Sequence, residues 1–348
     1  MIKKLIVGSG FSASIVNIAL NDSAEIYSVK DLNKLNSAGL IRRKNLDCNK
    51  VLSKKTLSLG SIKFFLKRSK LHDRLYISGN SNIWGGHINL AKLSKKLINL
   101  IKKKNILIQK LSYSITGTIS SNNYIHQLQN SSKEILKSTD LLDKIQNVIV
   151  LKLSFVNKKI FVDIMFLDTL KKKKIEVKKL FLCLGTIQLI DLLFRSKLLN
   201  EKDEIELTEF DCELSLKLKN SKFIKNATTI RYSFGRAIGH YLGLQSFTRF
   251  LNFLNFVPIF IDQIFYNKKS KIVFILKGNI FVEKKNTNAT KFGQSIHYCN
   301  MKINGVPMNR FLSKLNKNVI GFGMPFVEQK VPGPISNDIL LDIEKKIV

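Results

Sequence analysis

The stretch KLIVGSGFSASIVNIAL, from Lys4 to Leu20, decides the fold of this chain. It opens with the apolar run Leu5-Ile6-Val7, which is typical of a buried strand, and continues after the glycines with apolar residues at helical spacing. Gly8 permits a tight turn and Gly10 permits a close approach of the backbone to a ligand, while Ala13 stands where a third glycine is usual. The pattern predicts a strand, a turn and a helix whose N-terminus faces a pyrophosphate.

The residues after this helix predict a second strand, AEIYSVKD, from Ala24 to Asp31. Asp31 follows Gly8 at close to the offset of about 20 residues at which an acid binds a ribose hydroxyl in dinucleotide-binding folds. Lys30 stands directly before it, so the alignment of this acid with the dinucleotide-binding pattern is left open to within one residue. Strand, glycine turn, helix and strand together predict the first half of a dinucleotide-binding unit.

Composition is that of a globular protein. The chain has 348 residues, of which 45% are hydrophobic, so it is long enough for a full core and for one large or two ordinary domains. Its four cysteines are scattered and lack CxxC spacing, which argues against a disulfide scaffold and a structural zinc site, and we expect no metal. No apolar signal segment follows Met1, which favours a cytoplasmic location.

The formal net charge of +33 suggests nucleic acid or an anionic membrane as a partner when it is taken alone. The lysines form short runs without interleaved aromatic residues or a recognisable nucleic-acid-binding motif, so a solvated basic surface is favoured and nucleic acid is not expected as a partner. The most apolar stretch, Arg249 to Phe265, is interrupted by Asn252, Pro258 and Asp262 and is too short for a membrane span. Peripheral contact with an anionic membrane stays open.

Further along the chain, alternating apolar residues predict a β-meander. Its strands are Val148 to Val156 and Ile160 to Leu167, with a turn at residues 157–159, and a buried strand, Leu180 to Leu184, and a helix, Ile187 to Leu199, follow it. We also expect helices at residues 91–104, 132–145 and 337–348, a strand at 106–110 and a loop at 112–130. An acidic cluster at 200–213 marks a boundary, so the predicted division is a first domain of residues 1–204 and 293–348 and a smaller second domain of residues 205–292.

Several landmarks occur in an order that resembles one enzyme family. The pattern GxGxxA begins at Gly8, GNSNIWGG covers residues 79–86, LFLCLGTIQLIDLLFRS covers residues 180–196, SIHYCNMKINGVPM surrounds His297, and GPIS lies near the end of the sequence. This order resembles the glucose–methanol–choline (GMC) oxidoreductases, a family of FAD enzymes. The resemblance implies an α/β fold, with an FAD-binding Rossmann-like domain that contains an inserted β-meander and a smaller α+β substrate domain.

The resemblance also implies which residues bind FAD. The first glycine turn would contact the pyrophosphate, the tryptophan-bearing loop would lie against the flavin ring, and the strand end before the later helix would lie beside the cofactor. The predicted cofactor-binding residues are Gly8, Ser9, Gly10, Phe11, Ser12, Ala13, Asp31, Asn82, Trp84, Gly85, Gly86, His87, Gly185 and Thr186. An alternative for Trp84, the only tryptophan, is a core anchor beside a turn.

Catalysis in the family passes a hydride from an alcohol to the flavin while a histidine near the C-terminus accepts the hydroxyl proton. His297 stands at the corresponding place, and a neutral imidazole suits a base that works near neutral pH. This sequence departs from the family at Gly333, where a second His or Asn is usual, and at Gly323-Met324-Pro325, where Asp-Ala-Ser is usual.

The prediction is an FAD-dependent oxidoreductase that oxidises a CH–OH group of an alcohol. A carbohydrate is expected because the short chain implies a reduced substrate domain and an open site, and the electron acceptor stays open. The alternatives are an FAD- or nucleotide-binding protein without turnover, a nicotinamide enzyme that shares only the first motif, and a basic nucleic-acid-binding protein.

Overall fold

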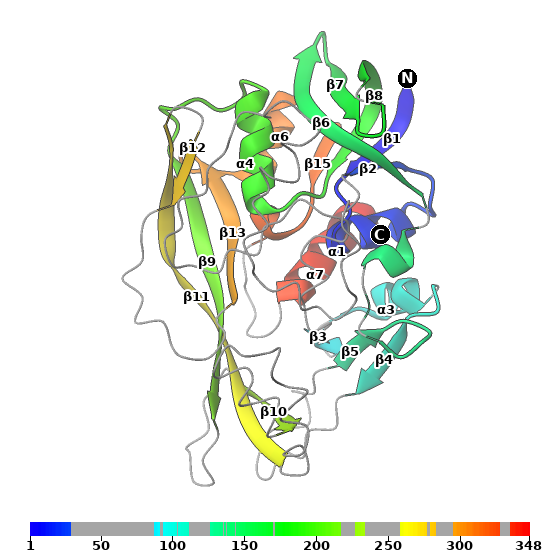
Figure 1. The fold of residues 1–348 in the computed structure, drawn as a ribbon, viewed down its shortest axis with the longest axis vertical. Coiled ribbons are helices and arrows are strands. Elements are labelled where there is room, and N and C mark those ends of the chain that lie inside the picture. The colour runs from blue at the N-terminus through cyan, green and yellow to red at the C-terminus, as the bar shows by residue number, and fades with distance from the viewer. Residues whose placement is uncertain are drawn as a thin grey trace.

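A computed structural model of the chain describes residues 1–28, 87–90, 93–102, 104–110, 126–134, 136, 138–142, 144–169, 171–216, 227–233, 258–276, 279–282, 295–327 and 335–348. Two large sheets and one small sheet organise these residues (Figure 1). The first large sheet is mostly parallel and has helices packed on it, and the long strands of the second run along one side of the molecule. The mixed α/β class that the sequence predicts is confirmed.

The parallel part of the first sheet has the strand order β6-β2-β1-β8-β15. Its strands are β1 (Ile2–Val7), β2 (Glu25–Ser28), β6 (Ile145–Val156), β8 (Lys172–Leu182) and β15 (Val319–Gly321). β1 lies in the middle, and Leu5 and Ile6 are fully buried, as expected for an apolar run covered on both faces. The order changes direction at β1, as it does in the doubly wound sheets that bind dinucleotides.

A β-meander extends from the same sheet. β7 (Lys159–Phe166) pairs antiparallel with the far part of β6 and with the first part of β8. The hairpin between β6 and β7 turns at Asn157 and Lys158, whose φ values of 49° and 62° are those of the turn that joins twisted antiparallel strands most readily. The predicted meander is therefore confirmed, and β6 and β8 belong both to it and to the parallel sheet.

Helices cover both faces of the parallel sheet because alternate residues of β1 point to opposite sides. Leu5 and Val7 belong to one core, and Ile6 belongs to the other. The first core includes side chains of α4 (Thr186–Arg195) and α6 (Met308–Leu315), and the second includes those of α1 (Phe11–Ala19), α3 (Lys95–Lys102) and α7 (Ile335–Ile347). The helices predicted for α3, α4 and α7 are confirmed with shifted ends, and α6 is an element that the sequence reading missed.

The second large sheet is antiparallel and has the order β10-β11-β9-β13-β14, with β12 paired to β11. Its strands are β9 (Ile205–Leu216), β10 (Ala227–Ser233), β11 (Pro258–Leu276), β12 (Asn279–Val282), β13 (Ser295–Ile303) and β14 (Val306–Pro307). The start of β9 and the end of β13 meet at one place, where the Glu204 N–H donates to Asn304 Oδ1 and the Asn304 N–H donates to the Glu204 carbonyl, both at 2.8 Å. β13 pairs with β9 across the expected boundary at residue 293, and the division into domains stays a prediction.

The small sheet has the order β3-β5-β4, formed by β3 (His87–Ile88), β5 (His126–Gln129) and β4 (Leu107–Lys110). The loop expected at 112–130 is therefore wrong in its last part, which is β5. The helix expected at 132–145 is also wrong, because this segment contains a turn, a short 3-10 helix η3 (Ser138–Leu141) and the start of β6. Asn130 Oδ1 accepts the N–H groups of Ser132 at 3.1 Å and Glu134 at 3.0 Å, a local turn that competes with a helix.

No helix within the described ranges is long and apolar enough to span a membrane. The apolar stretch from Arg249 to Phe265 is described only from Pro258 onward, where it forms the start of β11. That part of the stretch pairs with β10 and β9, so it is a strand of the antiparallel sheet.

Candidate cofactor site

The turn between β1 and α1 lies where the carboxyl ends of β1, β2 and β8 meet. The Gly8 N–H donates to the Tyr27 carbonyl on β2, and the Cys183 N–H, just after β8, donates to the Val7 carbonyl, both at 2.9 Å. Gly8 has a φ of 117°, and a Cβ atom there would lie 2.3 Å from the Cys183 carbonyl oxygen. The close approach of β8 therefore requires glycine, at the point of the sheet where open α/β folds bind ligands.

α1 begins after Gly10 with no side-chain cap and no acidic residue in its first turn. The first N–H groups of such a helix and the positive end of its dipole suit an anion. The side chains of Phe11, Ser12 and Ala13 are buried, and Ala13 is fully so, which packs the helix closely on the sheet. These predicted residues can therefore contribute to a cofactor site mainly through their backbone.

Ser9 fixes the turn through its hydroxyl and its carbonyl. Its Oγ lies 2.8 Å from Ser28 Oγ at the end of β2, and its carbonyl accepts the Ser138 hydroxyl of η3 at 2.6 Å. Both neighbours therefore hold the turn at the edge of the sheet. Asp31, the predicted ribose ligand, follows Ser28 closely in sequence and lies outside the described residues.

Gly323, directly after β15, packs against the first turn of α1. Its φ is 106°, and a Cβ atom there would lie 2.9 Å from Ser12 Oγ and 3.9 Å from the Leu184 carbonyl oxygen. The position is therefore too close to α1 for a larger side chain. This contact gives a physical reason why the acid that is usual in the GMC pattern is absent here.

Thr186 joins the two large sheets. It is the first residue of α4, is 1% exposed, and its hydroxyl donates to the Tyr298 carbonyl of β13. His297, the predicted base, precedes Tyr298 on the same strand and pairs with Phe210 of β9. The structure thus brings the strand that carries His297 to the end of β8, and the His297 side chain lies outside what is described.

The C-terminal helix α7 holds the end of β3, the strand that follows Trp84 in the sequence. The Asn89 N–H donates to Asn337 Oδ1 at 2.8 Å, and Asn337 Nδ2 donates to the Asn89 carbonyl at 2.7 Å. The amide of Asn337 thus binds both backbone groups of Asn89, just after β3. His87 lies on β3, its side chain is not described, and the predicted residues Asn82, Trp84, Gly85 and Gly86 lie outside the described ranges, as does Gly333.

Charged and ionisable groups behind the turn are neutral or paired. Burial raises the pKa of the Cys183 thiol, and the Lys346 ammonium opposes this only in part, so the thiol stays protonated at neutral pH and is a poor nucleophile. Lys346 Nζ donates to Asp342 Oδ2 at 2.7 Å, to Asn309 Oδ1 at 2.9 Å and to the Gly321 carbonyl at 3.0 Å. This ammonium joins α6, β15 and α7 behind the site.

The structure brings together the predicted residues Gly8 to Ala13 with the ends of β8 and β15. It also shows residues that the sequence reading missed, namely Ser28, Ser138, Tyr298 and Asn337. Ser28 could have been found from its place at the carboxyl end of a predicted strand. The others act through contacts between segments far apart in the chain, for which the sequence carries no local signal.

No family model matches the chain, and no curated protein does. Solved structures that match include a flavoprotein/dehydrogenase from Cytophaga hutchinsonii, 12% identical, which covers 66% of this chain and 50% of its own, with a TM-score of 0.27. The substrate-free rebeccamycin biosynthetic enzyme RebC is 9% identical over 98% of this chain and 60% of its own, with a TM-score of 0.36. AlpK is 6% identical over 99% of this chain and 61% of its own, with a TM-score of 0.41.

The chain thus spans between 50% and 61% of the length of these proteins. RebC has also been solved with reduced flavin, so flavin is found in a matched protein and is also the cofactor class that the sequence predicts here. Identities and TM-scores of this size assign no family, ligand or activity to this chain.

Proposed function

We propose that this chain binds FAD, with the ADP half at the N-terminus of α1, and works as an FAD-dependent oxidoreductase. The observation that carries the proposal is the turn at Gly8, where β8 approaches so closely that a Cβ atom would lie 2.3 Å from a carbonyl oxygen. The uncapped first turn of α1 and the paired hydroxyls of Ser9 and Ser28 lie beside it. The N-terminus of a helix without a side-chain cap, next to a glycine turn that leaves no room for a side chain, fits a pyrophosphate.

In this proposal the residues of the chain bind and orient the cofactor. The N–H groups of the first turn of α1 hold the pyrophosphate, and the loop that contains Trp84 lies against the flavin ring. Asn337 positions that loop because its amide makes two hydrogen bonds to the backbone of Asn89, which follows the loop closely in the chain. FAD, when bound, supplies the hydride acceptor.

The substrate in this proposal is an alcohol, in keeping with the GMC resemblance, and a carbohydrate in particular. His297 on β13 accepts the hydroxyl proton, since its strand is joined to the end of β8 by the bond from Thr186 to Tyr298. An external electron acceptor reoxidises the flavin.

One absorbance spectrum tests the cofactor. The purified full chain should show flavin bands, either as isolated or after incubation with FAD and removal of the free cofactor. Anaerobic addition of glycosides or sugar nucleotides should then bleach these bands in the unaltered chain and leave them unchanged in His297→Ala. A protein that stays colourless after reconstitution contradicts the cofactor, and bleaching by small aliphatic alcohols alone contradicts the carbohydrate.

A second candidate is an FAD-binding protein without turnover. The contact between Gly323 and Ser12 favours it, because it leaves no space for the acid that the GMC pattern has at this position. Flavin bands that no alcohol bleaches, together with identical spectra for the unaltered chain and His297→Ala, would support this candidate over the enzyme.

A further inference from the structure

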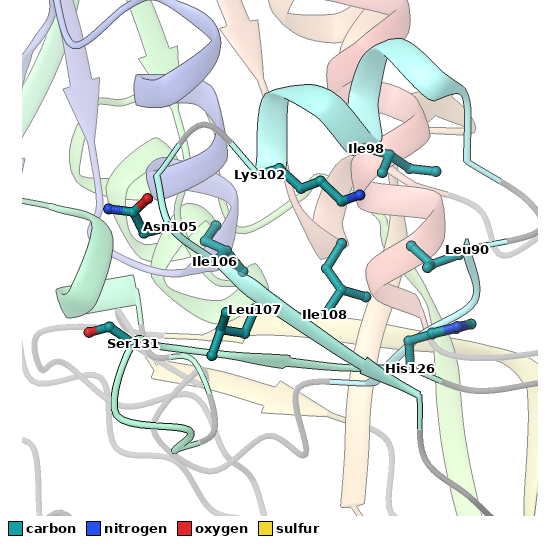
Figure 2. Close-up of a pocket in the computed structure, with 9 residues that line it drawn as sticks. All are labelled: Leu90, Ile98, Lys102, Asn105, Ile106, Leu107, Ile108, His126 and Ser131. Atoms are coloured by element: carbon teal, nitrogen blue, oxygen red, sulfur yellow. The ribbon is translucent and has the colours of Figure 1, made fainter.

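A pocket lies between α3 and the small sheet (Figure 2). Its volume is about 710 Å³, within the range of pockets that hold small molecules. None of the residues predicted to bind FAD lines it. The lining residues are Leu90, Ile98, Lys102, Asn105, Ile106, Leu107, Ile108, His126 and Ser131.

The middle of this pocket is aliphatic. Leu90, Ile98 and Ile108 are only partly buried, although they pack against the core that α1, α3 and α7 share. Leu107 is 40% exposed, and only Met1 and Val156 join it as exposed large hydrophobic residues in the described part of the chain. Leu90, Ile98 and Ile108 thus leave apolar surface uncovered between α3 and β4, as suits the apolar part of a ligand, whereas Leu107 points to the other side of the strand (Figure 2).

The charge at the pocket is positive. Lys102 follows Ile98 by one turn of α3, so both side chains lie on the same face of the helix, and Figure 2 shows them beside each other over the pocket. Lys102 is exposed, and no acidic side chain is among the residues that line the pocket. Asn105 and Ser131 add polar groups at one end (Figure 2). A ligand that is complementary to this surface has an aliphatic body and a single anionic group.

We propose that this pocket binds a medium-chain fatty acid. The aliphatic chain lies on Leu90, Ile98 and Ile108, and the carboxylate pairs with the Lys102 ammonium. A single lysine is a compact point charge, which pairs with the single charge of a carboxylate.

Isothermal titration of the full chain with octanoate, decanoate and dodecanoate, each kept monomeric, tests the proposal. Affinity should rise about two- to fourfold for every added methylene, because each buried methylene contributes to binding. Dodecanol should bind at least tenfold more weakly than dodecanoate, since it lacks the charge that faces Lys102.

Two variants on one helix locate the site. Lys102→Glu should weaken dodecanoate binding at least tenfold, whereas Lys95→Glu, an equal charge reversal at an exposed residue of α3 that does not line the pocket, should leave it unchanged. Ile98→Gln, which replaces a partly buried aliphatic side chain of α3 that lines the pocket, should weaken binding of all the acids.

Three results would overturn the proposal. The first is absence of binding, and the second is equal weakening by both lysine variants, which would assign the effect to the general positive charge of the surface. The third is binding only to vesicles that contain phosphatidylserine and not to monomeric acids, which would assign this face to a membrane.

Discussion

Gly8 is the residue that constrains the candidate site most strongly. A methyl group there would overlap the Cys183 carbonyl, and the φ of 117° is unfavourable for any other residue. We expect Gly8→Ala to lower the free energy of unfolding by about 3 kcal/mol or more and to abolish flavin binding. Chemical denaturation and flavin absorbance measure the two effects.

Gly305 offers a matched control for this substitution. Its φ is 74°, but a Cβ atom there would have nothing within 4 Å. Gly305→Ala should therefore lower the free energy of unfolding by only about 1–2 kcal/mol, because it adds backbone strain but no steric overlap, and flavin binding should persist. Equal losses in both variants would show that backbone strain, and not the approach of β8, makes glycine necessary at residue 8.

Thr186 allows a test of the link between the sheets. Thr186→Val removes the hydroxyl that donates to Tyr298 and leaves a buried carbonyl without that donor, so we expect a loss of about 1–3 kcal/mol in the free energy of unfolding. Thr186→Ser keeps the hydroxyl and should lose less than half as much. Under the proposed function, the valine variant should also lower kcat while flavin binding persists. Equal stability of the two variants would mean that this hydrogen bond contributes nothing.

At the residue scale, local chemistry was predictable and long-range contacts were not. The roles of Gly8 in the turn and of Ala13 in packing follow from their spacing after an apolar run, because both act on neighbours in the chain. Asn337 bonds to Asn89 across 248 residues, and no local pattern in the sequence indicates such a pair. The ring-contact role of Trp84 and the catalytic role of His297 stay predictions.

Among the elements, α7 is joined to β15 and α6 through the half-buried side chain of Lys346. Lys346→Met would leave the Asp342 carboxylate largely buried without its partner, so we expect a loss of about 3 kcal/mol in the free energy of unfolding. Lys345→Met changes an exposed lysine of the same helix and should cost less than about 0.5 kcal/mol. Urea denaturation of the three proteins measures the difference, and a similar small loss in both variants would contradict a structural role for Lys346.

The same lysine gives a pH dependence with a definite sign. Burial lowers the pKa of Lys346 below its ordinary value of 10.5, against the opposing effect of the Asp342 carboxylate. Between the two pKa values the unfolded chain binds more protons than the folded chain, so the free energy of unfolding rises with pH in this window. The difference in stability between the unaltered chain and Lys346→Met should therefore grow as the pH rises toward the ordinary lysine pKa of 10.5. A difference that shrinks over this range would contradict the assignment.

Elements with strong local signals were the ones that the sequence predicted. The meander has alternating apolar residues and a turn at Asn157, and α4 and α7 have apolar residues at helical spacing. The segment at 132–145 has similar spacing, but the turn at Asn130 and the pairing of Ile145 with Ile26 on β2 override it. β15 is only three residues long and is fixed by its neighbour β8, so its sequence alone could not reveal it.

For the whole molecule, cofactor binding should appear as an increase in the free energy of unfolding. A ligand that binds only the folded chain raises the free energy of unfolding by about 2.7 kcal/mol at about 100 times its Kd. We expect FAD to raise the melting temperature in this way, and NAD to leave it unchanged at the same concentration. A shift with NAD and none with FAD would favour the nicotinamide alternative, and Gly8→Ala should remove whichever shift occurs.

The meeting of Glu204 and Asn304 at one point has an evolutionary consequence. Because Glu204 directly precedes β9 and Asn304 directly follows β13, and the two are hydrogen-bonded to each other, the strands between them behave topologically as an insertion with adjacent ends. Such a segment can be lengthened, shortened or exchanged by recombination without any change in the order of the strands around Gly8. A lineage built on this plan could exchange most of its antiparallel sheet while the parallel sheet around Gly8 is inherited unchanged.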